Sequence, residues 1–303
     1  MNSKWLRRWV AVGMTAMLAG PLILPAQTMA QAEEPPGPSA NVSVYATGLN
    51  NPRGLKFGPD GALYLCNNGG FEWIRQDGLL IPGHIAADYT TGRIERIDLA
   101  TGTVERLYDA CDGRPLSGPN DIVFDADGGF WFTDLGKIRD RATDHGGLYY
   151  AKPDGSGIRC AVYGPNMNGV GLSPDGRTVY TALTMERTLL AFDITGPGEV
   201  APSPLAALPG RVVTAFAGHI LLDSLAVDAD GHICVATIAG RPGIASVDAA
   251  TGAQTWRDFP DLVTTNICFG GADMRDAWVT LSSTGRLAKT RWDRPGLKLA
   301  HYG

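Results

Sequence analysis

Short apolar runs separated by tight-turn sequences recur along the chain from about residue 52 to residue 285. Four units share an apolar run, a turn that ends in Asp-Gly, and an aromatic or β-branched run. They are residues 54–57 with 63–65, 122–124 with 130–132, 170–172 with 179–180, and 225–227 with 233–235. Residues 267–269 and 277–279 form a fifth unit without that turn. Because Asp-Gly favours a tight hairpin turn, each unit predicts an inner pair of antiparallel strands.

Outer strands follow the inner pairs, as in residues 93–98 with 104–108 and residues 244–248 with 254–257. Four short antiparallel strands per unit, arranged radially, form the blade of a β-propeller. A β-sandwich is the alternative, but it would not repeat the same turn chemistry five times. We therefore predict an all-β propeller with five countable units. We expect strands from residues 41–49 and 287–302 to complete the last unit and close the ring.

The first unit carries an insertion, residues 69–91, which contains Glu72 and Trp73. Such a segment is either a lid over a site or an excursion on the surface, and the sequence leaves both open.

The composition is that of a globular protein, with 44% hydrophobic and 19% charged residues among 303, and its 39 glycines and 20 prolines favour many turns. Residues 1–30 combine a basic start, an apolar stretch and small residues at a cleavage position, which indicates a signal peptide. We expect a linker at 31–40, one propeller domain at 41–303, and a periplasmic or secreted protein without stable membrane insertion.

Charge and cysteine content narrow the function classes. Removing Lys4, Arg7 and Arg8 with the signal leaves 23 basic against 31 acidic residues, a net charge of about −8. This balance excludes nucleic acid and anionic lipid as partners, and it would attract a divalent cation. The partner that we expect is a small-molecule substrate. The five cysteines include no CxxC pair, so zinc-ribbon and thioredoxin motifs are absent. Cys234 and Cys268 lie in apolar runs and are expected to be buried.

One polar position recurs at the same offset in each unit. Counting back eight residues from the glycine of the Asp-Gly turn reaches Arg53, Asn120, Asn168 and Asp223, and alignment of the aromatic Trp278 gives Asn266 in the fifth unit. Equivalent positions of successive blades converge at one end of the central channel. Amide and carboxylate oxygens suit Ca²⁺ and disfavour zinc. Capping of local turns is the structural alternative for these residues.

Four motifs resemble the SMP-30/gluconolactonase/LRE-like family. They are Ser-Gly-Pro-Asn-Asp at 117–121, Phe-Thr-Asp at 132–134, Met-Asn-Gly at 167–169 and Thr-Asn at 265–266, and Asp223 accompanies them. The resemblance implies a six-bladed propeller with one divalent metal at the channel mouth and lactone hydrolysis. It assigns Asn120, Asn168 and Asp223 as metal ligands and Asp223 as the catalytic carboxylate. The family's first ligand, a Glu in a Glu-Gly-Pro motif, has no counterpart: Arg53 stands there, or that blade is missing.

The leading expectation is an exported lactonase-like hydrolase of a small lactone or related ester. A calcium ion would polarise the carbonyl, Asp223 would handle the attacking water, and Arg53, Asn266, Glu72 and Trp73 would contact the substrate. The alternatives are a metal-independent propeller like strictosidine synthase and a periplasmic propeller that binds a small molecule without turnover. A serine triad has no support, since the chain lacks a Gly-x-Ser-x-Gly elbow.

Overall fold

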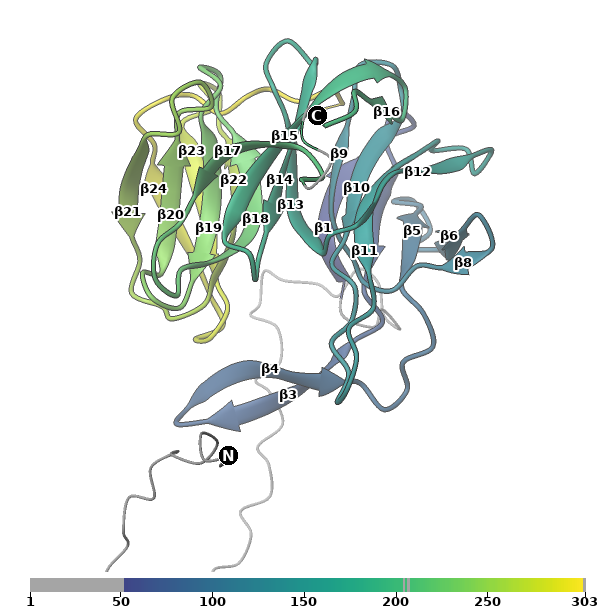
Figure 1. The fold of residues 1–303 in the computed structure, drawn as a ribbon, viewed down its shortest axis with the longest axis horizontal. Helices are drawn as coiled ribbons and strands as arrows, with labels where there is room; N and C mark the ends of the chain where they lie inside the picture. The colour runs from purple at the N-terminus through teal and green to yellow at the C-terminus, as the bar shows by residue number, and fades with distance from the viewer. Residues whose placement is uncertain (1–51, 204, 206–207, 302–303) are drawn as a thin grey trace, which may run out of the picture. The chain divides into compact units, whose positions relative to one another are not determined.

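The computed structural model describes residues 52–203, 205 and 208–301, all of which form strands, turns and loops (Figure 1). Contacts divide the chain into two units, Met1–Val44 and Tyr45–Gly303, and the described residues belong to the second. The expected signal peptide, the linker at 31–40 and the closing strand at 41–49 lie outside the described residues. Within the described part, no helix has the length and apolarity needed to cross a bilayer.

Five antiparallel sheets form the blades of a propeller, as the turn pattern predicted (Figure 1). Blade 1 contains β1 (Pro52–Phe57), β2 (Leu63–Asn67), β5 (Arg93–Ile97) and β6 (Val104–Tyr108). Blade 2 contains β9 (Pro119–Phe124), β10 (Phe130–Asp134), β11 (Gly146–Ala151) and β12 (Ile158–Gly164). Blade 3 contains β13 (Met167–Leu172), β14 (Thr178–Leu183) and β15 (Thr188–Gly196), with β16 (Glu199–Val200) and β17 (Arg211–Ala215) paired to β15. Blade 4 contains β18 (Leu221–Val227), β19 (Ile233–Ile238), β20 (Gly243–Val247) and β21 (Gln254–Asp258). Blade 5 contains β22 (Thr264–Gly270), β23 (Asp276–Leu281) and β24 (Arg286–Arg291).

Two small hairpins lie outside these sheets. The insertion forms β3 (Phe71–Gln76) and β4 (Leu79–Ile85), which pair only with each other and stand apart from the blades in Figure 1. A short second hairpin joins β7 (Ala110–Cys111) to β8 (Arg114–Pro115).

The Asp-Gly turns have the backbone that their sequence predicts. In all four, the glycine takes a positive φ of between 68° and 88°, a region that only glycine adopts without strain. The inner hairpins of blades 1 to 4 therefore follow directly from this local sequence.

Each of the four interfaces from blade 1 to blade 5 is an apolar layer, and the strands of the middle blades contribute to two of these layers. In β10, Phe130 and Phe132 pack into the layer with blade 1, while Trp131 packs into the layer with blade 3. All three are fully buried. A strand buried on both faces reads as an unbroken apolar run, which explains the sequence Phe-Trp-Phe.

The two expected cysteine positions differ because both faces of β19 are covered, whereas the face of β22 that carries Cys268 is not. Cys234 is fully buried between blades 4 and 5, as expected. The expectation for Cys268 is wrong, since its side chain is exposed. Its neighbours Ile267 and Phe269 take the buried face, against blade 4.

The C-terminal residues follow a different course from the one expected. After β24 the described residues through His301 form no further strand, so the prediction of strands across 287–302 holds only for its first part. Pro295 lacks the N–H that a ladder needs. Instead, Leu297 and Leu299 line a narrow cavity together with residues of all five inner strands. The tail therefore lies beside the central cavity at the end where these strands finish.

Asp121 joins the blades at the centre of the ring. Its buried carboxylate accepts hydrogen bonds from the amide of Ile122 in its own strand, at 2.9 Å, and from that of Val170 in blade 3, at 3.3 Å. Burial raises the pKa of Asp121, and the amide of Leu225 in blade 4 is among the groups that oppose this shift. In blade 1, a Cβ on Gly54 would lie 2.5 Å from Asp121 Oδ1, so only glycine fits there.

We predict that Asp121→Ala lowers the free energy of unfolding by roughly 3 kcal/mol or more, because it leaves buried backbone amides of several blades without an acceptor. Denaturant melts of the variant and the parent measure the change. Asp127→Ala, at an exposed position in the turn of the same blade, is the matched control and should stay within about 0.5 kcal/mol of the parent. Equal stability of Asp121→Ala and the parent would show that this carboxylate does not hold the blades.

Candidate functional site

Each inner strand begins with a β-bulge, and the polar positions lie in these bulges. In β13, Met167 pairs with Leu183 and the next pair is Val170 with Thr181, so one extra residue is accommodated. Bulges of this kind turn a side chain out of the regular ladder. The residues that directly follow the last pair before each bulge are Arg53 in β1, Asn120 in β9, Asn168 in β13 and Asp223 in β18.

The strand register moves the fifth equivalent position by one residue. In β22, Thr264 pairs with Leu281 and Ile267 pairs with Val279, which makes Thr265 the counterpart of Asn168. Asn266 corresponds to Gly169 instead. Counting from Trp278 missed this because the turn of blade 5 is one residue longer than that of blade 3. The substrate role of Asn266 stays a prediction.

The polar side chains of blades 2, 3 and 4 meet in a buried cluster, which we call the channel mouth. Asn120 Nδ2 donates to Asn168 Oδ1 at 2.7 Å, and Asn168 Nδ2 donates to Thr184 Oγ1 at 3.0 Å. Asp223 Oδ1 accepts the amide of Ser224 at 3.0 Å. Asn120, Asn168 and Asp223 are all buried, so the sequence analysis placed these three together correctly.

Asp223 is the carboxylate of this cluster, and its environment favours the protonated form. Burial raises its pKa to about 6, while the charge of Arg53 and a hydrogen bond from Asn168 act in the opposite direction. A carboxyl group that titrates near neutral pH is able to accept a proton from water and to return it.

Arg53 lies beside this carboxylate without a hydrogen bond at its Nε atom. Nε is buried and has no partner among the described residues. Burial lowers the pKa of Arg53, and the attraction of Asp223 opposes that shift, yet these two described side chains form no direct ion pair. The guanidinium carbon lies 5.4 Å from the centre of the Phe71 ring, so the insertion reaches the mouth.

Lys137 is a residue that the sequence analysis missed. It follows β10 in a loop and is nearly inaccessible to solvent, and its Nζ atom donates to the carbonyl of Gly70 at 2.9 Å. The same atom lies 3.9 Å from the centre of the Phe71 ring and 5.0 Å from that of Tyr89. Burial, assisted by the charge of Arg53, lowers the pKa of Lys137 to about 8. A lysine in a glycine-containing loop usually faces water, so the local sequence around Lys137 does not predict that its side chain is buried.

Glu72 and Trp73 lie on β3 with exposed side chains, and Trp73 is 45% exposed. The described residues show no contact from either side chain to Arg53, Asn120, Asn168 or Asp223, and Phe71 is the part of the insertion that approaches the mouth. Their role in substrate binding stays a prediction.

The residues of the mouth do not fit a divalent cation. Among the described residues, no three His, Cys, Asp or Glu side chains are placed to hold a metal ion. The expected oxygen set of Asn120, Asn168 and Asp223 contains one carboxylate, and the amide oxygen of Asn168 already accepts a hydrogen bond. The neighbouring guanidinium of Arg53 would repel a dication. The side chain of Glu72 is exposed on β3 and does not complete the set.

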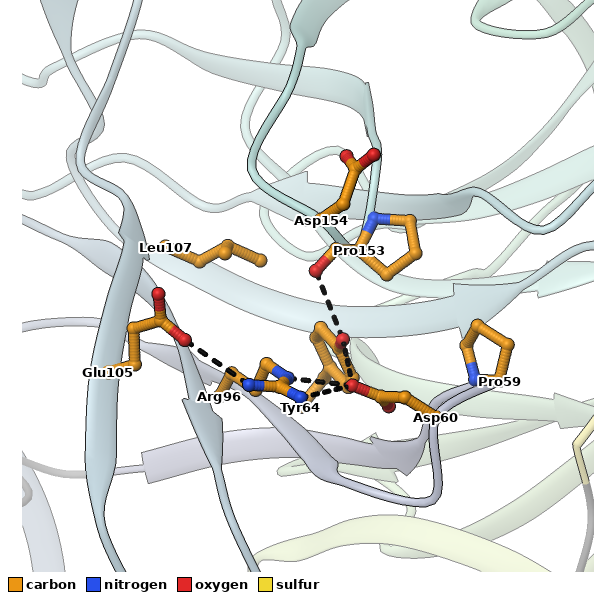
Figure 2. A pocket seen from close by; sticks show the side chains of 8 residues that line it. All are labelled: Pro59, Asp60, Tyr64, Arg96, Glu105, Leu107, Pro153 and Asp154. Carbon is orange, nitrogen blue, oxygen red and sulfur yellow. Dashed lines mark hydrogen bonds and ion pairs between the residues drawn. The ribbon is translucent and has the colours of Figure 1, made fainter.

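Another hollow, of about 330 Å³, lies between blade 1 and the turn at Pro153 (Figure 2). Its charged and polar groups bind one another: Arg96 contacts Asp60 at 2.5 Å and Glu105 at 3.3 Å, and the Tyr64 hydroxyl donates to Asp60. Because these groups satisfy each other, we assign the candidate site to the channel mouth.

Comparison with known proteins finds a family and a fold. The sequence profile described as the SMP-30/Gluconolactonase/LRE-like region matches residues 37–283. The lactonase drp35 of Staphylococcus saprophyticus is 30% identical over 195 residues, which cover 64% of this chain and 52% of that protein. The chain thus spans about half the length of the curated relatives it matches.

Two solved structures share the fold at low sequence identity. A gluconolactonase from Xanthomonas campestris has a TM-score of 0.61 and 22% identity over 82% of this chain and 74% of its own. Regucalcin from Agrobacterium tumefaciens, described as a calcium-binding protein, has a TM-score of 0.57 and 19% identity over 84% of this chain and 96% of its own.

We predict that Lys137→Met loosens the β3–β4 hairpin, because it removes the hydrogen bond to Gly70 and the charge against Phe71 and Tyr89. Trypsin should cleave the variant after the exposed Arg75 several-fold faster than the parent, since cleavage follows the population of the open form. Lys298→Met, at an exposed position, is the control. Mass spectrometry of the fragments measures the rate, and unchanged cleavage at Arg75 would contradict the role of Lys137.

Proposed function

The chain belongs to the SMP-30/gluconolactonase/LRE-like family, and on that premise we propose that it hydrolyses a small lactone or related ester at the channel mouth. The observation that carries the proposal is Asp223, a buried carboxyl whose pKa is raised to about 6, beside Asn168 and Arg53. The lactonase drp35 and the gluconolactonase from Xanthomonas campestris support the choice of reaction.

The reaction needs one group that moves a proton. The carboxylate of Asp223 accepts a proton from a water molecule while the water oxygen bonds to the lactone carbonyl carbon. The ring C–O bond then breaks, and the leaving oxygen takes the proton back from Asp223 to give a hydroxycarboxylic acid, which ionises in water. Asn168 donates a hydrogen bond to Asp223. Asn168 also accepts one from Asn120, so the position of Asp223 is linked through Asn168 to blade 2.

A metal has no step in this scheme. Calcium binding is stated for the regucalcin neighbour, and the family resemblance extends it to Asn120, Asn168 and Asp223. The guanidinium of Arg53 beside the carboxylate of the set is the observation that argues against such an ion here. It favours a form of the proposed hydrolysis that proceeds without a metal ion.

We predict that Asp223→Asn lowers kcat/KM for an active lactone by about 10² to 10⁴, because the amide keeps the size of the side chain and loses its basicity. The activity of the parent should fall as the pH drops through about 6, where Asp223 becomes protonated next to Arg53 and Asp121. Initial rates across a lactone panel between pH 4.5 and 8.5 measure both effects. Asp127→Asn, at the exposed turn position, is the control and should keep the parental profile.

Stability should change in the opposite sense to activity. A carboxyl whose pKa is raised from 3.8 to about 6 on folding destabilises the ionised protein, at pH 8 by something on the order of 3 kcal/mol. Asp223→Asn should therefore melt at a higher temperature than the parent at pH 8, and the gain should shrink toward pH 5. Hydrolysis at the parental rate by Asp223→Asn would overturn the assignment and favour a propeller that only binds small molecules.

A further inference from the structure

We infer that the channel mouth is a carboxylate-binding site in which Arg53 takes the place of a divalent cation. The inference deepens the proposed function and rests on it only for the choice of probe. Opening a lactone yields a hydroxycarboxylate, and such an anion has the chemistry that the mouth would recognise.

Arg53 supplies the first observation. It occupies the same bulge position in blade 1 as Asn120, Asn168 and Asp223 do in theirs, so its side chain belongs to the same ring. Its Nε is buried and lacks a hydrogen-bond partner among the described residues. A buried donor without an acceptor destabilises the protein, and more so when it is charged, so a ligand oxygen that accepts from Nε would be favoured at this position.

The charges around Arg53 supply the second observation. Lys137 lies against the same Phe71 ring, so two cationic side chains contact one aromatic ring at the mouth. The nearby carboxylates do not neutralise them directly. Asp134 accepts hydrogen bonds from three backbone amides, those of Ser117, Gly118 and Gly136. Asp121 accepts hydrogen bonds from the amides of Ile122 and Val170. Asp223 forms no ion pair with Arg53.

Both observations favour a carboxylate over the other candidate ions. The guanidinium presents N–H groups in a planar fork that matches the two oxygens of a carboxylate. A divalent cation would meet the charges of Arg53 and Lys137. A phosphate dianion would meet stronger repulsion from the buried Asp223 than a carboxylate, which carries a single charge.

Calorimetric titration of the full chain in metal-free buffer tests the inference. The probes are 4-hydroxybutyrate, its neutral analogue 4-hydroxybutyramide, inorganic phosphate, and CaCl₂. We expect 4-hydroxybutyrate to bind at least roughly tenfold more tightly than the amide and phosphate, and calcium to give no heat of binding.

Variants locate the site. Arg53→Met should abolish binding of 4-hydroxybutyrate, and Arg53→Lys, which keeps the charge without the fork, should weaken it several-fold. Lys298→Met should bind as the parent does, and a melting curve for each variant confirms folding.

Parental affinity in a folded Arg53→Met, or calcium binding that excludes 4-hydroxybutyrate, would overturn the inference. Carboxylate binding by a protein that turns over no lactone would sustain the inference while refuting the proposed function. Lactone turnover without carboxylate binding would sustain the proposed function and refute the inference.

Discussion

The buried carboxylate of Asp121 is the interaction on which the centre of this propeller depends. It satisfies amides in blades 2 and 3, with the Leu225 amide of blade 4 close by, and it occupies space that blade 1 provides by having glycine at position 54. A ring of separate sheets has few covalent or hydrogen-bonded links between blades, since each ladder ends at its own edge. A shared acceptor at the axis therefore sets the spacing of the inner strands and, with it, the positions of the side chains at the mouth.

Apolar layers between the blades supply most of the stabilisation around that centre. Four such layers separate the five blades, and the strands alternate between them, as β10 does with Phe132 and Trp131. Burial on this scale contributes about 25 cal/mol for each Å² of apolar surface removed from water. This framework tolerates bulges at the start of each inner strand, because the remainder of the strand stays paired. The bulges direct polar groups into the channel without weakening the layers.

The channel mouth contains buried charged side chains, which are uncommon in the core of a folded protein. Arg53, Lys137 and Asp223 all have pKa values shifted by burial in the direction that disfavours their charged forms. Such shifts concentrate where a protein binds or transforms a ligand. The positive groups at this mouth distinguish it from an oxygen-lined cation site, and they connect the proposed hydrolysis of a lactone to recognition of its carboxylate product.

The repeated Asp-Gly turns and apolar runs determined the fold, because hairpin turns and strand alternation depend on residues close together in the chain. The common offset likewise predicted, from the order of residues alone, that Asn120, Asn168 and Asp223 lie close together. The offset failed in blade 5, where the equivalent of Asn168 is Thr265, because a longer turn changes the count while strand pairing does not. Only the tertiary structure revealed Lys137 and Phe71 beside Arg53, the exposure of Cys268 and the course of the C-terminal tail. These depend on contacts between segments far apart in sequence, and no local pattern records which distant side chain will desolvate a charge or line a channel.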